Sequence, residues 1–260
     1  MINTLDPAQS PALGAALGLA GETVLVTGAT RGIGAALATG LARLGMHVVA
    51  VGRDKERLDA LAGAEGLSIH PVEAEVTDEA AMAAAFDTAV SVTGRLLGAV
   101  ANAGIAFVQP SIAFSAEDFR KTLDVNVVGV FLTTRLAAER LPEGGSVVLT
   151  SSTFSASAFE QWAAYSASKS AVSMLARSLG AEWAPRGVRV NAVGPTATLT
   201  DQNRDYLGVP ENSAGIVARI PAGRLLEPEE LVLPFAFLLS PKNQMITGQT
   251  LFVDGGWTLP

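Results

Sequence analysis

Short apolar runs alternate along the chain with longer segments in which apolar residues recur every three or four positions. Runs rich in β-branched residues predict seven strands, at 23–28, 47–52, 68–73, 98–103, 146–151, 188–194 and 249–255. Most are apolar throughout, which is typical of strands covered on both faces. Helical spacing occupies the segments between them, at 32–45, 54–63, 78–93, 115–140, 160–183 and 227–240. The alternation predicts a doubly wound α/β fold, with a parallel seven-stranded sheet and helices on both faces.

Two segments lie outside this alternation of predicted strands and helices. Residues 1–20 lack the basic start of a signal peptide and have too short an apolar run for a membrane span, so we expect a loose arm or a short helix there. No linker or repeat divides the remainder, and we expect residues 21–260 to form one domain. Within it, residues 196–226 are long, mixed in composition and polar at their start. A long insertion at the carboxyl edge of a parallel sheet is typical of a substrate lid.

Composition narrows the classes of function. The chain has 260 residues, of which 49 % are apolar and 17 % charged, as in a globular protein. Its net charge of −7, without a basic stripe, argues against a nucleic-acid partner. The lack of cysteine excludes disulfides, thiolate nucleophiles and cysteine-ligated metals. With no apolar window long enough for a membrane span, we expect a soluble, cytoplasmic protein.

The first predicted strand is followed by the turn TGATRGIG, whose glycines are Gly28, Gly32 and Gly34. This spacing differs from the G-x-G-x-x-G dinucleotide fingerprint, but the physical use is the same. Glycines let backbone N–H groups approach a pyrophosphate, and the helix start behind them favours negative charge. The alternative is a tight strand–helix turn that binds nothing.

The end of the second predicted strand bears on the cofactor. An NAD site has a carboxylate there for the ribose hydroxyls, but this chain has Gly52 followed by Arg53. Arg31 lies in the glycine turn, and two guanidiniums suit a 2′-phosphate, at roughly 1.5–3 kcal/mol for each charge-assisted hydrogen bond. We therefore expect NADP(H) to be favoured over NAD(H). The alternative is that both arginines are solvated, with Asp54 neutralising Arg53.

The stretch QWAAYSASKS places Tyr165 and Lys169 on one face of a helix, four residues apart. Lowering a tyrosine pKa from about 10 towards 7 takes about 4 kcal/mol. A charge about 4 Å away, at an effective dielectric of about 20, supplies about that much. The pair therefore predicts a tyrosine that acts as an acid/base at neutral pH. The alternative is an ordinary pair on a helix surface.

Further motifs occur in order around these. They are VANAG at 100–104, Asn126 in DVNVVG, Ser152 in TSS, VNAVGPT at 190–196 and FVDGGW near the end. Together with the glycine turn and Y-x-x-x-K, they make residues 20–257 similar to the short-chain dehydrogenase/reductase family, including its NADP-dependent, 3-oxoacyl-reductase-like members. The resemblance implies a Rossmann fold and a single catalytic domain.

The resemblance also implies roles for four side chains. Tyr165 would give its proton to the carbonyl oxygen while NADPH supplies hydride to the carbon, and Ser152 would bond the same oxygen. Lys169 would lower the Tyr165 pKa and bond the nicotinamide ribose. Asn126 would hold a water that links Lys169 to solvent. No metal is needed, and we expect structural roles for His47 and His70.

The cofactor site implied by the resemblance includes Tyr165 and Lys169 and a longer set drawn from the motifs: Gly28, Thr30, Arg31, Gly32, Ile33, Gly34, Arg53, Glu75, Val76, Asn102, Ala103, Gly104, Pro195, Thr196, Thr198 and Thr200. Thr200 would contact the nicotinamide carboxamide, or else cap the following helix. The chain departs from the family pattern at three of the motif positions, Ala101, Glu75 and Thr196.

The expected substrate pocket is largely aromatic. Its candidate residues are Ser152, Phe154, Phe159, Trp162 and Tyr206. They favour a medium-sized ketone with an apolar body, and no arginine or lysine cluster is visible for a phosphate or carboxylate tail.

The sequence thus predicts an oxidoreductase that interconverts a ketone and a secondary alcohol with NADP(H). An NAD(P)-linked alcohol or polyol dehydrogenase working oxidatively is the alternative, and a non-catalytic nucleotide-binding sensor is a third. The resemblance further implies a homotetramer or homodimer formed by the helices at 115–140 and 160–183 and by the last strand. Trp257–Pro260 would reach a neighbouring subunit.

Overall fold

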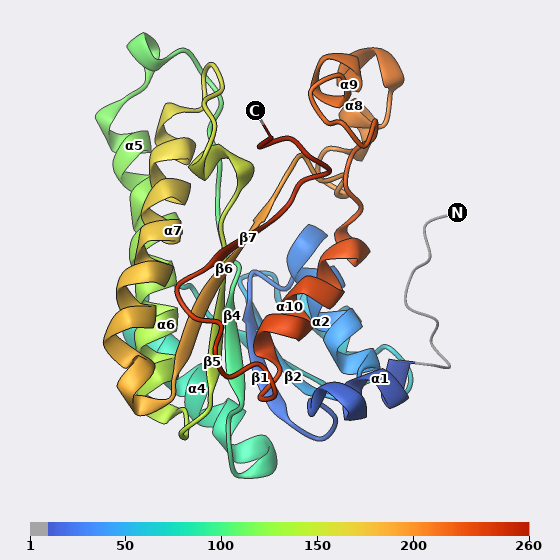
Figure 1. Cartoon of the computed structure of the whole chain (residues 1–260), viewed down its shortest axis with the longest axis vertical. Helices are drawn as coiled ribbons and strands as arrows, with labels where there is room; N and C mark the ends of the chain where they lie inside the picture. Colours follow the sequence, from blue (N-terminus) through green and yellow to red (C-terminus); the bar gives the residue numbers. More distant parts are fainter. Residues whose placement is uncertain (1–9, 260) are drawn as a thin grey trace.

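The computed structural model describes residues 10–259, and it confirms the doubly wound parallel sheet (Figure 1). Seven strands are paired in parallel in the order β3(Ile69–Glu73), β2(His47–Gly52), β1(Thr23–Thr27), β4(Gly98–Ala101), β5(Ser146–Thr150), β6(Arg189–Pro195) and β7(Thr250–Val253). The strand order reverses between β1 and β4. In such sheets the ligand crevice lies at this reversal, beyond the carboxyl ends of the strands.

Helices cover both faces of the sheet and enclose two cores. One face carries α4(Glu79–Thr93), α6(Gly129–Arg140) and α7(Ala163–Trp183), and its core includes Phe86 and Leu149. The other face carries α2(Gly32–Arg43), α3(Lys55–Ala62) and α10(Val232–Leu239), with Leu37 and Phe235 in its core. Short 3-10 helices occur at η1(Ser111–Ala113), η3(Thr153–Ser155), η4(Ala184–Arg186) and η5(Pro228–Leu231).

The N-terminal segment contains the short helix α1(Ser10–Leu17), while residues 1–9 lie outside the described part. Its end is tied to the domain because Ser240 Oγ donates to the Leu17 carbonyl at 2.6 Å. Leu19 is fully buried in the same core as Leu37. Of the two expectations for this segment, the helix is the one seen in residues 10–17.

The segment predicted as one helix over 115–140 is divided into three. α5(Ala116–Leu123) leads into a π-helical turn, η2(Asp124–Val128), which continues as α6. A π turn adds a residue to the helix and is frequent at functional sites. It contains Asn126, one of the predicted catalytic residues.

The insertion at 196–226 lies at the carboxyl end of the sheet, where it forms α8(Arg204–Leu207) and α9(Pro210–Val217) (Figure 1). A parallel bridge between Thr198 and Leu226 closes its base. Across residues 10–259, no helix has the length and apolar character needed to span a membrane.

Candidate active site

The structure brings together the four predicted catalytic residues at the carboxyl ends of β4 and β5. Lys169 is only 3 % exposed, and its Nζ donates to the Thr150 carbonyl at 2.7 Å, 5.5 Å from the centre of the Tyr165 ring. Ser152 follows β5 and hydrogen-bonds Tyr165. Asn126 reaches α7 by donating to Ser168 Oγ at 3.0 Å.

The electrostatics differ from the sequence-based expectation that Lys169 lowers the Tyr165 pKa. Burial raises the pKa of Tyr165, and the Ser152 hydrogen bond opposes that rise. Burial also lowers the pKa of Lys169 to about 8. The lysine lies beneath the ring and is bonded to a carbonyl, so desolvation dominates both groups. At neutral pH the tyrosine is therefore a neutral phenol, which is the form that donates a proton.

The side chain of Asn126 is bonded on three sides. Its amide donates to the Ile105 carbonyl at 2.9 Å, and its oxygen accepts from the Ile105 N–H at 2.8 Å. Together with the bond to Ser168, this ties the loop after β4 to α7. Asn126 therefore positions the loop backbone beside Gly104, and its link to a water remains a prediction.

The glycine turn has the backbone that its sequence requires. Gly28 and Gly32 have φ of 67° and 53°, in the left-handed region that favours glycine. A methyl group on Gly34 would lie 2.0 Å from the Gly28 carbonyl oxygen. Thr27 Oγ1 accepts from the Asn102 and Ala103 backbone N–H groups, at 3.0 and 3.2 Å, and so fastens the end of β4 to the turn.

The departure from the family pattern at Ala101 and the lack of a carboxylate at position 52 both have structural explanations. Ala101 is buried in the sheet, and Asn102 supplies the polar links by donating to the Thr27 carbonyl and accepting from Thr150 Oγ1. At the end of β2, a methyl group on Gly52 would lie 2.5 Å from Thr30 Cγ2. Thr30 therefore leaves no room for a carboxylate side chain at position 52.

At the expected ribose site, both arginines are exposed and each has a side-chain partner, and binding of a 2′-phosphate there remains a prediction. Arg53 Nη1 lies 3.2 Å from Glu75 Oε2. With its amide oriented to satisfy both groups, Gln202 accepts from Arg31 at 2.9–3.0 Å. Asp54 caps α3 and pairs with Arg57, so it does not neutralise Arg53.

Beyond β6, the predicted nicotinamide residues line the base of the insertion. Pro195 ends β6, and the Thr196 hydroxyl is buried without a hydrogen-bond partner in the described residues. Thr198 Oγ1 donates to the Thr196 carbonyl at 2.9 Å. The Thr200 methyl lies 3.2 Å from where a Cβ on Gly32 would stand. Asn203 is the N-cap of α8, so the capping alternative for Thr200 is wrong.

The remaining predicted cofactor residues divide between core and turn. Val76 is buried against Gly129, and Ile33 packs against the core that contains Leu37. Gly104 lies between the turn and the catalytic residues, where an added Cβ would be 3.6 Å from Lys169 Nζ. Of these residues, Gly104 is therefore the one that lies beside the catalytic lysine.

An aromatic wall adjoins the tyrosine. Phe154 lies at the middle of this aromatic wall. Its ring centre is 5.6 Å from that of Phe159, 5.3 Å from that of Trp162 and 6.1 Å from that of Tyr165. Gln161, just before Trp162, is the non-glycine residue with positive φ, at 69°, in the described chain. Such backbone strain is typical of functional sites. Tyr206 is 64 % exposed and makes no ring contact with this wall.

Two members of the wall were missed from the sequence. Trp257 lies 6.3 Å from Phe154, is 9 % exposed, and donates to Ser157 Oγ. It packs within its own chain, whereas Leu259 is exposed and Pro260 lies outside the described residues, so a contact of Trp257–Pro260 with a neighbouring subunit remains a prediction. Arg219, from the end of the insertion, lies over the Trp257 and Phe159 rings at 4.5 and 5.0 Å. A lone arginine in a polar insertion gave no pattern that pointed to this site.

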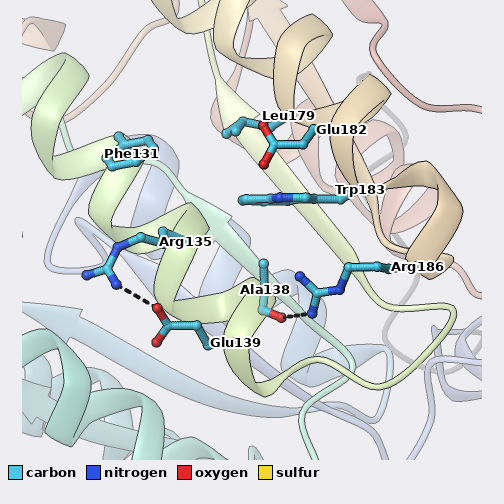
Figure 2. Close-up of a pocket in the computed structure, with 8 residues that line it drawn as sticks. All are labelled: Phe131, Arg135, Ala138, Glu139, Leu179, Glu182, Trp183 and Arg186. Carbon is cyan, nitrogen blue, oxygen red and sulfur yellow. Dashed lines mark hydrogen bonds and ion pairs between the residues drawn. The ribbon is translucent and has the colours of Figure 1, made fainter.

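Other polar or hollow regions lie elsewhere. A hollow on the outer face of α6 and α7 is lined by Phe131, Trp183 and their neighbours and contains none of the predicted site residues (Figure 2). His47 and His70 share the Ser68 hydroxyl at 2.7 and 3.2 Å, at the start of β2 and in β3. Residues 10–259 contain no group of three or more His, Cys, Asp or Glu side chains arranged to hold a metal.

Comparison with known proteins identifies the family. Residues 28–258 match a family model described as enoyl-(acyl carrier protein) reductase. The chain is 37 % identical to D-threitol dehydrogenase of Mycolicibacterium smegmatis over 93 % of its length and 94 % of that protein's. It is also 37 % identical to 3beta-hydroxysteroid dehydrogenase 1 of Eggerthella lenta, over 93 % and 95 %.

A solved structure gives the same assignment. A putative NAD(P)-dependent gluconate 5-dehydrogenase from Beutenbergia cavernae, with bound NADP, has a TM-score of 0.83 and 39 % identity, covering 93 % of this chain and 98 % of that one. Fold, site order and these similarities lead to one conclusion: the chain belongs to the short-chain dehydrogenase/reductase family and is an oxidoreductase acting on CH–OH groups.

Proposed function

We propose that the protein interconverts a ketone and a secondary alcohol with NADP(H), using Tyr165 as the general acid/base. The observation that carries the proposal is the buried cluster at the end of β5, where Ser152 bonds Tyr165 and Lys169 lies beneath its ring. The cluster adjoins a glycine turn with the required backbone. The phenol is therefore next to the expected cofactor path.

The residues present fit a nicotinamide cofactor. Gly28, Gly32 and Gly34 leave the backbone of the turn without side chains, and the start of α2 lies directly behind it. The buried Thr196 hydroxyl lacks a hydrogen-bond partner in the described residues, so a polar group of the cofactor would satisfy it. Lys169 and Thr200 would hold the nicotinamide ribose and carboxamide.

When bound, the cofactor would supply or accept the hydride at the carbonyl carbon. The Tyr165 hydroxyl donates its proton to the oxygen of that carbonyl as negative charge develops there. The Ser152 oxygen accepts from the Phe154 N–H at 3.2 Å, and its hydrogen, which favours the Tyr165 phenolate in the free protein, would turn to the same substrate oxygen. Lys169, with a pKa of about 8, is mostly cationic at neutral pH and favours the phenolate left behind.

Because burial raises the Tyr165 pKa, the phenol is protonated at neutral pH, and this is the form from which reduction starts. Oxidation needs the phenolate, so an alcohol or polyol dehydrogenase built on this site would speed up as pH rises. The similarity to D-threitol dehydrogenase supports that oxidative alternative. Rates in both directions across pH 6–10 distinguish the two.

Cofactor preference rests on Arg31 and Arg53. Each has a partner that a 2′-phosphate can replace, since Gln202 is neutral and Glu75 is held in an exposed pair. The test is to titrate the protein with NADPH and NADH separately, following nicotinamide fluorescence. Tighter NADPH binding supports the proposal. Equal or tighter NADH binding overturns the preference, and binding of neither overturns the enzyme proposal itself.

We further propose that residues 196–226 close over the substrate and that the protein is a homotetramer or homodimer. Exposed apolar side chains gather on the elements named for assembly, including Phe131 and Met174 on α6 and α7 and Leu251 on β7. The hollow between α6 and α7 lies on one of these faces (Figure 2). A monomer mass from light scattering would overturn the assembly.

A further inference from the structure

We infer that Arg219 binds a carboxylate on the substrate, so that the ketone carries an anionic group beyond its apolar body. The inference rests on the proposed function and specifies its substrate class. The sequence shows no arginine or lysine cluster for a carboxylate tail, and here a single arginine would supply the charge.

The geometry presents the guanidinium at one end of the aromatic wall. Arg219 lies 4.5 Å from the Trp257 ring centre and 5.0 Å from that of Phe159. Stacking on rings leaves the N–H edges of a planar guanidinium free, in the fork arrangement that matches a carboxylate. The residue itself is exposed, so a ligand can reach it.

Arg219 differs from the other arginines of the insertion. Arg204 pairs with Glu227, and Arg224 pairs with Glu230. Within residues 10–259, Arg219 alone of the three has a guanidinium with neither a hydrogen bond nor an ion pair. The carboxylate of Asp254, in the same turn as Trp257, accepts from Gly256 and Thr258.

The same wall leads from Arg219 to the catalytic tyrosine. Phe154 contacts both Trp257 and Tyr165, with ring centres 6.3 and 6.1 Å away. A substrate whose carbonyl lies at Tyr165 and whose body lies along these rings has its far end near Arg219. The guanidinium without an ion-pair partner at that point favours an anion over a neutral tail, although the net charge of the protein is −7.

A purely structural role is the competing explanation. Arg219 also holds the end of the insertion against the C-terminal turn, although the Ala222 N–H already bonds the Gly255 carbonyl there at 2.9 Å. A clamp of that kind would act on every substrate alike. A carboxylate-binding residue would act on anionic substrates alone.

The experiment compares 4-acetylbenzoate with 4-acetylbenzamide, and 5-oxohexanoate with its amide. Binding is followed by tryptophan fluorescence and turnover by NADPH consumption, in the wild type, Arg219→Met and Arg219→Lys. Arg177→Met, which removes an exposed arginine on α7, controls for net charge. We expect the wild type to prefer at least one acid over its amide by about tenfold. Arg219→Met should lose that preference while keeping turnover of the amide within about twofold of the wild type. Arg219→Lys should keep part of the preference.

Equal losses on acid and amide would assign Arg219 to the structural clamp and overturn the inference, as would a wild type without acid preference in either pair. Arg219-dependent binding of an acid without any NADPH turnover would instead overturn the proposed function and leave this inference standing.

Discussion

The two ends of the proposed cofactor path carry their charges in opposite ways. At the catalytic end, Lys169 is 3 % exposed and is held by the Thr150 carbonyl inside the core. At the ribose end, the Arg53 side chain is 67 % exposed and pairs with Glu75 at the surface. Burial lowers the pKa of Lys169, whereas Arg53 is exposed to water, where ion pairs are weak. We therefore expect catalysis to depend on Lys169, a buried charge held in one position, and cofactor choice to depend on Arg53, an exposed charge that can change its partner.

Removing the phenol is expected to have the largest effect. Tyr165→Phe keeps the ring in its aromatic contacts but removes the proton donor, so kcat for ketone reduction should fall by about 10²–10⁴-fold. Tyr206→Phe is the matched control, since these are the chain's two tyrosines and Tyr206 is 64 % exposed. Steady-state kinetics with NADPH makes the comparison. Turnover by Tyr165→Phe within a few-fold of the wild type would refute the role.

The buried lysine should make stability depend on pH. Its pKa is about 8 in the folded protein against an ordinary 10.5, so between these values the unfolded chain holds the extra proton. Stability should therefore rise with pH, by on the order of 3 kcal/mol from pH 8 to 10.5 in the wild type relative to Lys169→Met. Urea unfolding of both proteins at several pH values measures this. Parallel pH profiles for the two proteins would contradict the burial of a titrating lysine.

At the exposed end, Arg53→Ala should weaken NADPH binding by about tenfold and leave NADH binding nearly unchanged, because the lost contact is to the 2′-phosphate. Arg57→Ala removes a neighbouring arginine that pairs with Asp54 and serves as the control. Fluorescence titration gives both dissociation constants. Equal weakening of NADPH and NADH would place Arg53 outside phosphate recognition.

The smallest effect is expected at the partner of Arg53. Glu75→Gln removes a carboxylate that competes with the phosphate, so NADPH should bind about two- to threefold more tightly, in line with the strength of an exposed ion pair. Glu73→Gln, on the same strand end, controls for net charge. Weaker NADPH binding in Glu75→Gln would instead make Glu75 a direct cofactor contact.

Much of the fold followed from the sequence because seven apolar runs and their intervening helices are all strongly patterned. The glycine turn and the order of Asn126, Ser152, Tyr165 and Lys169 along the chain likewise pointed to the edge where the structure gathers them. The π turn at 124–128 was missed because one extra residue hardly disturbs a helical pattern.

Long-range and electrostatic features were the least predictable. Trp257 joins Phe154, and Arg219 lies over Trp257, from distant parts of the chain, and no local pattern marks them. The pKa of Tyr165 was expected to fall because a lysine lies one turn away on its helix. Depth of burial, which sequence spacing does not report, raises it instead.

The most direct test of the division between a catalytic end and a cofactor-selecting end is to measure NADPH binding and turnover together in Tyr165→Phe. The account predicts a dissociation constant for NADPH within about twofold of the wild type and turnover reduced by at least about a hundredfold. Loss of binding together with turnover, or turnover that persists, would contradict it.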